Sequence, residues 1–348
     1  MSSLRKLPQL LLTVGDINGI GPEVLLKALR RILPTKSFVP TIIGNSRLLE
    51  EYLQALPLHD VSLSASELRV AGETIAIVDL PSEATLSIGS ETADAGKLAG
   101  DAIHKGVAML LDGSADGIVT MPISKSGLNS GGHHWPGHTE MLADLSGGNN
   151  PLMILASREM RVALMTIHVP LRQVPSLITP SLLSQRIHDF HNTLHIDFAL
   201  PSPRIAVLGL NPHAGESGSI GREEVETLVP AIEVAQAKGY SVEGPFPADG
   251  FFARYRPGMY DGILAAYHDQ GLIPLKMTAR GAGVNITAGL SIVRTSPDHG
   301  TAFAIAGNGE ADESSTVEAI EMALSIIENR TSSANREQLA TSTTHQDD

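Results

Sequence analysis

The sequence predicts an α/β fold built around a mostly parallel sheet. Short apolar runs end on turn-forming or polar residues, stretches with helical spacing separate them, and this alternation continues along most of the chain. Near-continuous apolar runs are typical of strands buried on both faces of a parallel sheet, and their alternation with helices indicates α/β architecture. At 348 residues the chain is long enough for two lobes with separate cores.

The predicted strands are six apolar runs, taken in order along the chain. They are residues 10–16, 40–45, 116–125, 161–168, 204–213 and 261–268. The predicted helices, with apolar residues at helical spacing, are residues 22–33, 92–111, 180–194, 222–239 and 314–329. Pro22 stands at the first position of its helix, where proline is favoured. Residues 331–348 are polar and lack periodicity, so we expect a disordered tail there.

Composition excludes several classes of function. The chain has 25 basic and 38 acidic residues, and its formal net charge of −13 disfavours binding to nucleic acid or to anionic membrane surfaces. The absence of cysteine excludes disulfides, thiolate catalysis and sulfur-ligated metal. We recognise no secretory leader and no apolar segment of the roughly 20 residues that a membrane span requires. A cytoplasmic protein is therefore expected.

Three of the predicted strands end in histidine, at His168, His213 and His268. In open α/β sheets ligands bind beyond the carboxyl ends of the strands, so these imidazoles would be delivered to one site. Imidazole is the commonest protein ligand for a divalent metal, and three such ligands with an open position are typical of catalytic sites. A metal there would act as a Lewis acid on a substrate oxygen. The structural alternative is that each histidine is an ordinary loop residue.

A second group of histidines lies at helical spacing on one predicted helix. His188, His191 and His195 belong to this group. No carboxylate or turn lies nearby that would direct these imidazoles to one point. We therefore interpret them as a solvated or half-buried helix face rather than a metal site.

Two glycine-containing segments suggest anion binding. The motif GDINGIGPE (15–23) puts glycines before a helix, which would offer backbone N–H groups to an anion. It is not the dinucleotide fingerprint, because the chain contains no G-x-G-x-x-G. The motif GHTE (137–140) offers His138 and Thr139 as donors, although Thr139 could equally cap a helix.

The segment from residue 274 to 307 is the richest in groups that bind anions. Lys276, Asn285 and Arg294 stand there among glycines and other small residues. Cations beside a glycine-lined backbone suit a small phosphorylated or carboxylated substrate, and arginine can contact it in a bidentate manner. Surface salt bridging is the structural alternative for each of them.

Taken together, five motifs resemble those of the 4-hydroxythreonine-4-phosphate dehydrogenases of pyridoxal phosphate biosynthesis. They are GHTE, LGLNPHAGESG, AAYHDQGLIPLK, GVNITAGL and RTSPDHGTA, and the resemblance extends from about residue 10 to 329. It implies a fold like that of the isocitrate and isopropylmalate dehydrogenases: two α/β/α lobes with a mostly parallel sheet around a central cleft, without the classical Rossmann fingerprint. We therefore expect one lobe of residues 1–125 and 285–330, and a second lobe of residues 126–284 with metal and dimer contacts.

The resemblance also implies a reaction and a set of site residues. The reaction is NAD- or NADP-dependent oxidation of the C3 hydroxyl of 4-phosphooxy-L-threonine to a 3-oxo acid, which decarboxylates to 3-amino-2-oxopropyl phosphate. One divalent metal (Zn, Mg or Co) per site would be held by His168, His213 and His268, the last supplied by the partner chain of a homodimer with its active site at the interface. The implied substrate contacts are His138, Thr139, Lys276, Asn285 and Arg294.

A base must also remove the proton of the substrate hydroxyl. Asp249, in PFPADGFF, and Lys125, in MPISK, are our candidates for this catalytic role or for a proton relay. The alternative for both is an ordinary loop position.

Two departures from the family pattern bear on the substrate. Ile17 stands where the family usually has proline, and Pro297 stands where valine is common. A sister group oxidises four-carbon sugar acid phosphates such as D-threonate or D-erythronate 4-phosphate, whereas GHTE and GVNIT favour the biosynthetic branch. Two further classes are compatible with these residues: a metal-dependent hydrolase of a small phosphorylated or acylated substrate, and a non-catalytic metal- or anion-binding module.

Overall fold

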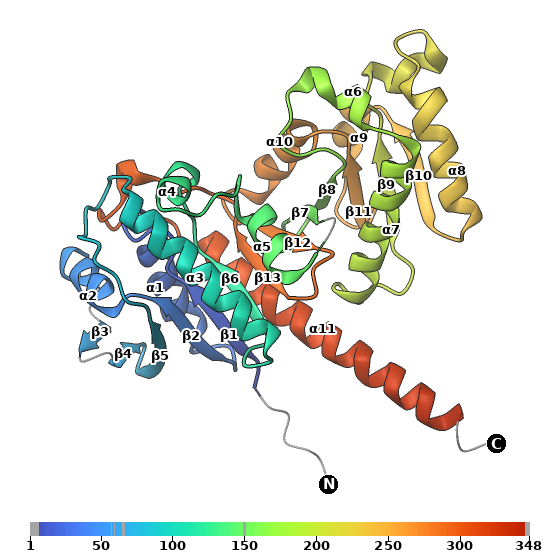
Figure 1. Ribbon diagram of the computed structural model, residues 1–348. Coiled ribbons are helices and arrows are strands. Elements are labelled where there is room, and N and C mark those ends of the chain that lie inside the picture. The colour runs from blue at the N-terminus through green and yellow to red at the C-terminus, as the bar shows by residue number, and fades with distance from the viewer. Residues whose placement is uncertain (1–6, 57, 59, 65–66, 149–150, 345–348) are drawn as a thin grey trace. The chain divides into compact units, whose positions relative to one another are not determined.

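The chain forms two compact units, each of mixed α/β structure as the sequence predicts (Figure 1). The computed structural model describes residues 7–344 apart from 57, 59, 65–66 and 149–150, and only the backbone of residues 335–344. Unit 1 comprises residues 1–151 and 290–327, and unit 2 comprises residues 152–289 and 328–348.

Unit 1 is built on a sheet with the strand order β13–β6–β1–β2–β5–β4–β3. The strands are β1 (Gln9–Thr13), β2 (Val39–Gly44), β3 (Val61–Ser64), β4 (Glu67–Val70), β5 (Glu73–Asp79), β6 (Gly117–Thr120) and β13 (Arg294–Pro297). Neighbours from β13 to β5 are parallel, and β4 pairs antiparallel with both β5 and β3. The chain moves from β1 to β2 on one side and later returns to β6 on the other. The carboxyl edge between β1 and β6 is therefore a topological switch point, where such sheets bind ligands.

The helices of unit 1 pack on this sheet or on one another, and three of them begin at a side-chain N-cap. They are α1 (Gly21–Ile32), α2 (Ser46–Ala55), α3 (Ala93–Leu111), α4 (Lys125–Ser130), α5 (His138–Ser146) and the first part of α11 (Ser314–Thr344). Side chains of Asn45, Thr92 and Ser124 accept backbone N–H groups at the starts of α2, α3 and α4, as good N-caps do. A core that includes Ile103 and Met141 packs α3, α4 and α5 together.

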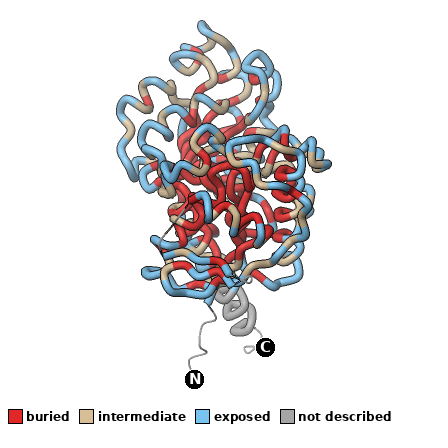
Figure 2. The backbone as a smooth tube through the Cα atoms, turned by 90° about the vertical axis from the view of Figure 1, so that its left-hand side faces the viewer, coloured by how far each residue is buried: buried red, intermediate tan, exposed pale blue. Residues whose placement is uncertain are grey.

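Unit 2 has a second sheet, with the strand order β10–β9–β11–β8–β7–β12. The strands are β7 (Leu152–Ala156), β8 (Arg161–Leu164), β9 (Arg204–Leu208), β10 (Ser241–Phe246), β11 (Gly262–Ala265) and β12 (Val284–Ala288). β10, β9, β11 and β8 are parallel, whereas β7 pairs antiparallel with both β8 and β12. Every residue of β7 and β11 is buried, as expected for strands covered on both faces. Figure 2 shows the buried residues of the chain in red.

Helices and short turns cover both faces of the sheet in unit 2. They are a 3₁₀ turn (Leu171–Gln173), α6 (Val174–Leu177), α7 (Pro180–Ile196), a turn at Pro212–Gly218, a π-helical turn (Glu224–Leu228), α8 (Val229–Ala237), α9 (Ala248–Arg254) and α10 (His268–Ala279). One core cluster joins β8, β9 and β11 to α9 and α10, and it includes Leu164, Ala206, Phe251, Ile263 and Leu272. The six predicted strands and five predicted helices are all present, and 222–239 divides into the π turn and α8.

The C-terminal helix α11 extends further than expected. Residues 331–344, predicted as part of a disordered tail, are helical, and residues 345–348 lie outside the described residues. Ala, Arg, Glu, Gln and Leu between 334 and 340 are good helix formers, and they lengthen a helix already nucleated by its buried first turns. The polar composition of this segment leaves no apolar periodicity, although its residues still favour a helix. None of the described helices is long and apolar enough to cross a membrane.

Candidate active site

The strand order of unit 2 places three histidines beyond the same edge of its sheet. β9, β11 and β8 are adjacent and parallel. His213, His268 and His168 follow the carboxyl ends of these strands by three to five residues. Such an edge is where parallel sheets present their ligand-binding side chains.

The three histidines do not form a complete metal site within one chain. The rings of His168 and His268 lie with their centroids 5.7 Å apart. Nδ1 of His268 is 2.7 Å from Oδ1 of the neighbouring Asp269. Among the residues that the structure describes, no group of three or more His, Cys, Asp or Glu side chains is arranged to hold a metal ion. The donors are of the right kind, but one chain brings together only two of the predicted ligands.

His213 begins a turn with an unusual backbone. His213, Ala214, Gly215, Glu216 and Ser217 all have left-handed φ angles, between 43° and 78°. Each non-glycine residue in this region costs free energy, and such strained segments concentrate at functional sites. Pro212 fixes the entry into the turn. A β-carbon at Gly215 would lie 2.6 Å from Oε2 of Glu224, so the turn is also closely packed.

The other predicted site residues of unit 2 come from three further elements. Asp249 is exposed on α9, which follows β10 and contacts the turn at 212–218. Lys276 is exposed on α10, two turns after His268. Asn285 is on β12, and its Oδ1 is buried without a hydrogen-bond partner. A buried amide oxygen without a partner is costly, and a bound ligand that donates a proton would remove that cost.

In unit 1, Arg294 is almost wholly buried beside Thr120. Only 1% of Arg294 and none of Thr120 is exposed. Thr120 Oγ1 accepts hydrogen bonds from Arg294 Nε at 3.1 Å and from Nη2 at 2.7 Å. Burial lowers the pKa of Arg294, because the charged form loses hydration.

His138 lies close to this arginine at the start of α5. Burial, with Arg294 and Lys125 nearby, lowers the pKa of His138 well below its usual 6.5, so its imidazole is neutral at pH 7. Its Nε2 is buried and has no hydrogen-bond partner. The structure thus brings together three of the predicted residues, His138, Lys125 and Arg294. Two cations beside an unpartnered imidazole nitrogen form a local environment that favours an anion.

One alternative and one expectation for the glycine-containing segments of unit 1 are wrong. Thr139 is not an N-cap, because α5 starts after Gly137 and its second residue is Thr139. The turn at 15–21 does not expose its N–H groups: Asp16 N donates to Pro122 O and Ile20 N donates to Thr301 O. Its glycines allow close backbone packing, since a β-carbon at Gly15 would lie 2.4 Å from the Pro122 carbonyl.

The same turn holds a buried acid that sequence reasoning missed. Asp16 has no exposed surface; its Oδ1 accepts from Asn18 N at 3.0 Å, and its Oδ2 has no partner. Burial, with Glu91 adding repulsion, raises the pKa of Asp16 to about 6. Glu91 in turn accepts from the hydroxyls of Ser124 and Ser126, beside Lys125. No local sequence signal marks Asp16 as buried, because the glycines around it predict an open turn.

The segment that leads into His138 carries the only tryptophan of the chain, Trp135. The imidazole of His133 stacks on Trp135 at 6.3 Å and that of His104 meets it edge-on at 5.5 Å. Trp135 Nε1 donates to Asp144 Oδ2 at 3.2 Å, and His133 Nε2 lies 3.1 Å from Asp101 Oδ1. These contacts fix the segment between α3 and α5.

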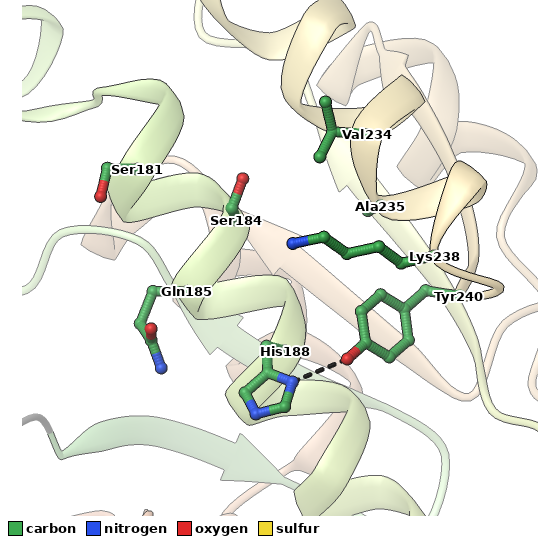
Figure 3. Close-up of a pocket in the computed structure, with 8 residues that line it drawn as sticks. All are labelled: Ser181, Ser184, Gln185, His188, Val234, Ala235, Lys238 and Tyr240. Carbon is green, nitrogen blue, oxygen red and sulfur yellow. Dashed lines mark hydrogen bonds between the residues drawn. The ribbon is translucent and has the colours of Figure 1, made fainter.

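The histidines at helical spacing line the side of α7. A pocket of about 240 Å³ separates α7 from α8, with Ser184, His188 and Lys238 on its walls (Figure 3). His188 Nδ1 is 2.7 Å from the hydroxyl of Tyr240, and the rings of His191 and Tyr240 are 4.6 Å apart. Mostly exposed side chains line this pocket, which agrees with a solvated helix face.

Comparison with known proteins decides the family. The profile described as pyridoxal phosphate biosynthetic protein PdxA matches residues 36–323. The chain belongs to this family. The PdxA relatives include a Bacteroides thetaiotaomicron protein named 4-hydroxythreonine-4-phosphate dehydrogenase, which is 41% identical over 325 residues covering 92% of this chain and 88% of the relative. A Cupriavidus necator protein named D-threonate 4-phosphate dehydrogenase is 44% identical over 319 residues, covering 90% and 96%.

Solved structures agree with the PdxA assignment. A 4-hydroxythreonine-4-phosphate dehydrogenase from Klebsiella pneumoniae has a TM-score of 0.81 and 37% identity, covering 92% of this chain and 99% of that one. A terephthalate 1,2-cis-dihydrodiol dehydrogenase from Burkholderia xenovorans, 24% identical with a TM-score of 0.61, shares the fold. The resemblance predicted from the motifs is confirmed, and the enzyme class, a dehydrogenase, is confirmed with it.

Proposed function

We propose that the protein oxidises the C3 hydroxyl of 4-phosphooxy-L-threonine with a nicotinamide cofactor, NAD or NADP. Hydride passes from C3 to the nicotinamide ring, and the hydroxyl proton passes to a base. The product is a 3-oxo acid, which loses carbon dioxide to give 3-amino-2-oxopropyl phosphate. The names of the PdxA relatives support this reaction.

The observation that carries the proposal is the cationic group of unit 1. Arg294 and Lys125 lie near enough to the half-buried His138 to lower its pKa, and the Nε2 atom of His138 is buried without a hydrogen-bond partner. A phosphate dianion is the group best matched to two cations and a neutral imidazole that can donate a hydrogen bond. We propose that His138 and Arg294 bind the substrate phosphate. Thr139, Lys276 and Asn285 are the further contacts that the family resemblance implies.

Asp249 and Lys125 are the proposed base or proton relay. Asp249 is exposed on α9, beyond the same edge of the sheet as the histidines, and so can exchange protons with solvent. General bases typically contribute 10²- to 10⁴-fold to a rate. Replacing Asp249 by Asn should lower kcat by roughly that factor without changing the melting temperature. Wild-type turnover in D249N would remove it from the mechanism.

The proposal includes a divalent metal that one chain does not hold by itself. A divalent metal bound by imidazoles polarises a substrate oxygen. We propose that His168 and His213 bind it together with the partner subunit's His268 in a homodimer. Exposed apolar side chains support such an interface: Ile273 is 58% exposed and Met277 is 74% exposed, one turn apart on the helix that begins at His268.

A second candidate substrate is D-threonate 4-phosphate, because the relative named for it is 44% identical to this chain. Both substrates are tested by following reduced nicotinamide absorbance with NAD and NADP, with and without a chelator. We expect faster turnover of 4-phosphooxy-L-threonine. Faster turnover of D-threonate 4-phosphate would reassign the substrate, and no nicotinamide reduction with either would refute the proposed function.

A further inference from the structure

The side chain of Arg294 reaches the carboxyl edge of its sheet along a neighbouring strand. Arg294 is the first residue of β13 and is in register with Ile118 of β6. Thr120 lies two residues further along β6 and therefore on the same face of the sheet as Ile118. Two residues of a strand span about 6.6 Å, a distance that an arginine side chain can cover. The guanidinium thus lies beside the last residue of β6.

Thr120 holds one defined edge of this guanidinium. Its Oγ1 accepts from Nε and from Nη2, the two donors that form the side-on edge of an arginine fork. Because the guanidinium is planar, two bonds to one fixed oxygen determine the orientation of the whole group. Thr120 is completely buried at the end of a strand, so the oxygen itself has little freedom to move.

We propose that Thr120 is a positioning residue that sets the plane in which Arg294 meets the substrate phosphate. This inference rests on the proposed function, since it assigns Arg294 to phosphate binding. Thr120 does not touch the substrate in this proposal; it acts through Arg294. Without this hydroxyl Arg294 keeps its positive charge, but the plane of its guanidinium is no longer fixed. A contact with an oxyanion that depends on the orientation of the guanidinium is then weaker.

Thr120→Val removes the hydroxyl while keeping the shape of the side chain, and Thr120→Ser keeps the hydroxyl. We expect T120V to raise KM for the phosphorylated substrate about tenfold or more, with kcat changed less than threefold. T120S should restore KM to within about threefold of wild type. If T120V does not fold, T120A compared with T120S makes the same comparison.

Thr295 provides a matched control. It is also a fully buried threonine, on β13 next to Arg294, but its hydroxyl donates to the carbonyl of Ala319. We expect T295V to lower the melting temperature without raising KM. An equal rise of KM in T120V and T295V would show that Thr120 acts only through stability and would overturn the inference.

Calorimetric titration with inorganic phosphate separates this inference from the proposed reaction. We expect wild type and T120S to bind phosphate, and T120V to bind it at least tenfold more weakly. Equal affinity in T120V and wild type would overturn the role of Thr120 even if the dehydrogenase activity is present. Weaker binding in T120V without turnover of either substrate would refute the proposed reaction and keep Thr120 as a positioning residue for an anion site. Wild type that neither binds phosphate nor turns over a substrate would overturn both.

Discussion

The buried carboxylate of Glu224 accepts hydrogen bonds from two nitrogens of Asn211. Its Oε1 is 2.7 Å from the backbone N of Asn211, and its Oε2 is 2.9 Å from Nδ2. Asn211 stands two residues before His213, at the entry to the left-handed turn. Glu224 itself begins the π-helical turn that precedes α8. The two irregular segments therefore stabilise each other, and the position of His213 depends on this pair.

Replacing Glu224 by Gln should destabilise the protein. Glutamine can accept only through one oxygen, and its amide would face a donor of Asn211. We expect the free energy of unfolding to fall by about 2 kcal/mol, as measured in urea. Glu226 lies on the same turn but is exposed and paired with Arg222, so E226Q is the control and should change stability by less than about 0.5 kcal/mol. Equal losses in the two variants would contradict the role of the Glu224–Asn211 pair.

The raised pKa of Asp16 predicts a pH-dependent stability. The folded protein keeps the Asp16 proton up to about pH 6, whereas the unfolded chain releases it near 3.8. Protonation therefore stabilises the fold fully below pH 3.8, and this stabilisation is lost as pH rises through about 6. Asp16→Asn should raise the free energy of unfolding at pH 8 by roughly 1–3 kcal/mol and leave it nearly unchanged at pH 4.

Urea unfolding of wild type and D16N between pH 4 and pH 8 provides the measurement. The exposed residue Glu50 supplies the control. E50Q should show no gain that grows with pH. A constant difference between D16N and wild type across this range would mean that Asp16 has an ordinary pKa.

Arg294→Lys tests whether charge alone suffices at this position. A lysine keeps the positive charge but cannot make both hydrogen bonds to Thr120 while presenting a planar fork to an oxyanion. We expect kcat/KM to fall at least about 100-fold, mainly through KM. Arg330 is a second partly buried arginine, paired with Asp197 at 2.7 Å, and R330K should affect stability but not KM. Wild-type KM in R294K would show that the guanidinium fork is not needed.

The exposed apolar side chains on α10 predict that carboxylates introduced among them dissociate the proposed dimer. Ile273→Glu and Met277→Glu place carboxylates within the proposed dimer interface, where burial of an unpaired charge is unfavourable. We expect sedimentation to show monomers, and metal content per chain to fall in parallel. Val234 on α8 is 49% exposed and serves as the control, because V234E should leave the dimer intact. Monomeric variants with full metal content would show that one chain holds the metal alone.

The sequence predicted the parts of the fold that depend on local pattern. Every predicted strand lies in a long apolar run, and the three histidines follow strands that are adjacent in the sheet. Seven strands were missed, namely β3, β4, β5, β7, β10, β12 and β13. The apolar run of β7 has no turn signal before β8, and β12 alternates apolar residues with Asn285 and Thr287, of which Asn285 was interpreted as a site residue.

Residues of the candidate site could be predicted only where the residue type itself indicates a chemical role. Histidines and cations stand out in a sequence, so His138 and Arg294 could be singled out before the structure placed them together. Thr120, Asp16 and Glu224 could not, because what distinguishes them is complete or nearly complete burial and, for Thr120 and Glu224, partners 174 and 13 residues away. Such partners are set by tertiary packing, and no local spacing encodes them. The metal, the homodimer and the roles of Asp249 and Lys125 stay predictions.

The lone tryptophan gives this protein an optical signal of its own. Indole emission responds to the charge and distance of neighbouring groups, and Trp135 has His104, His133 and Asp144 around it. Since it stands three residues before His138, any ligand that shifts the start of α5 would change that emission without a label or a coupled assay. Occupancy of unit 1 could therefore be followed in real time during mixing, even with variants that have no turnover.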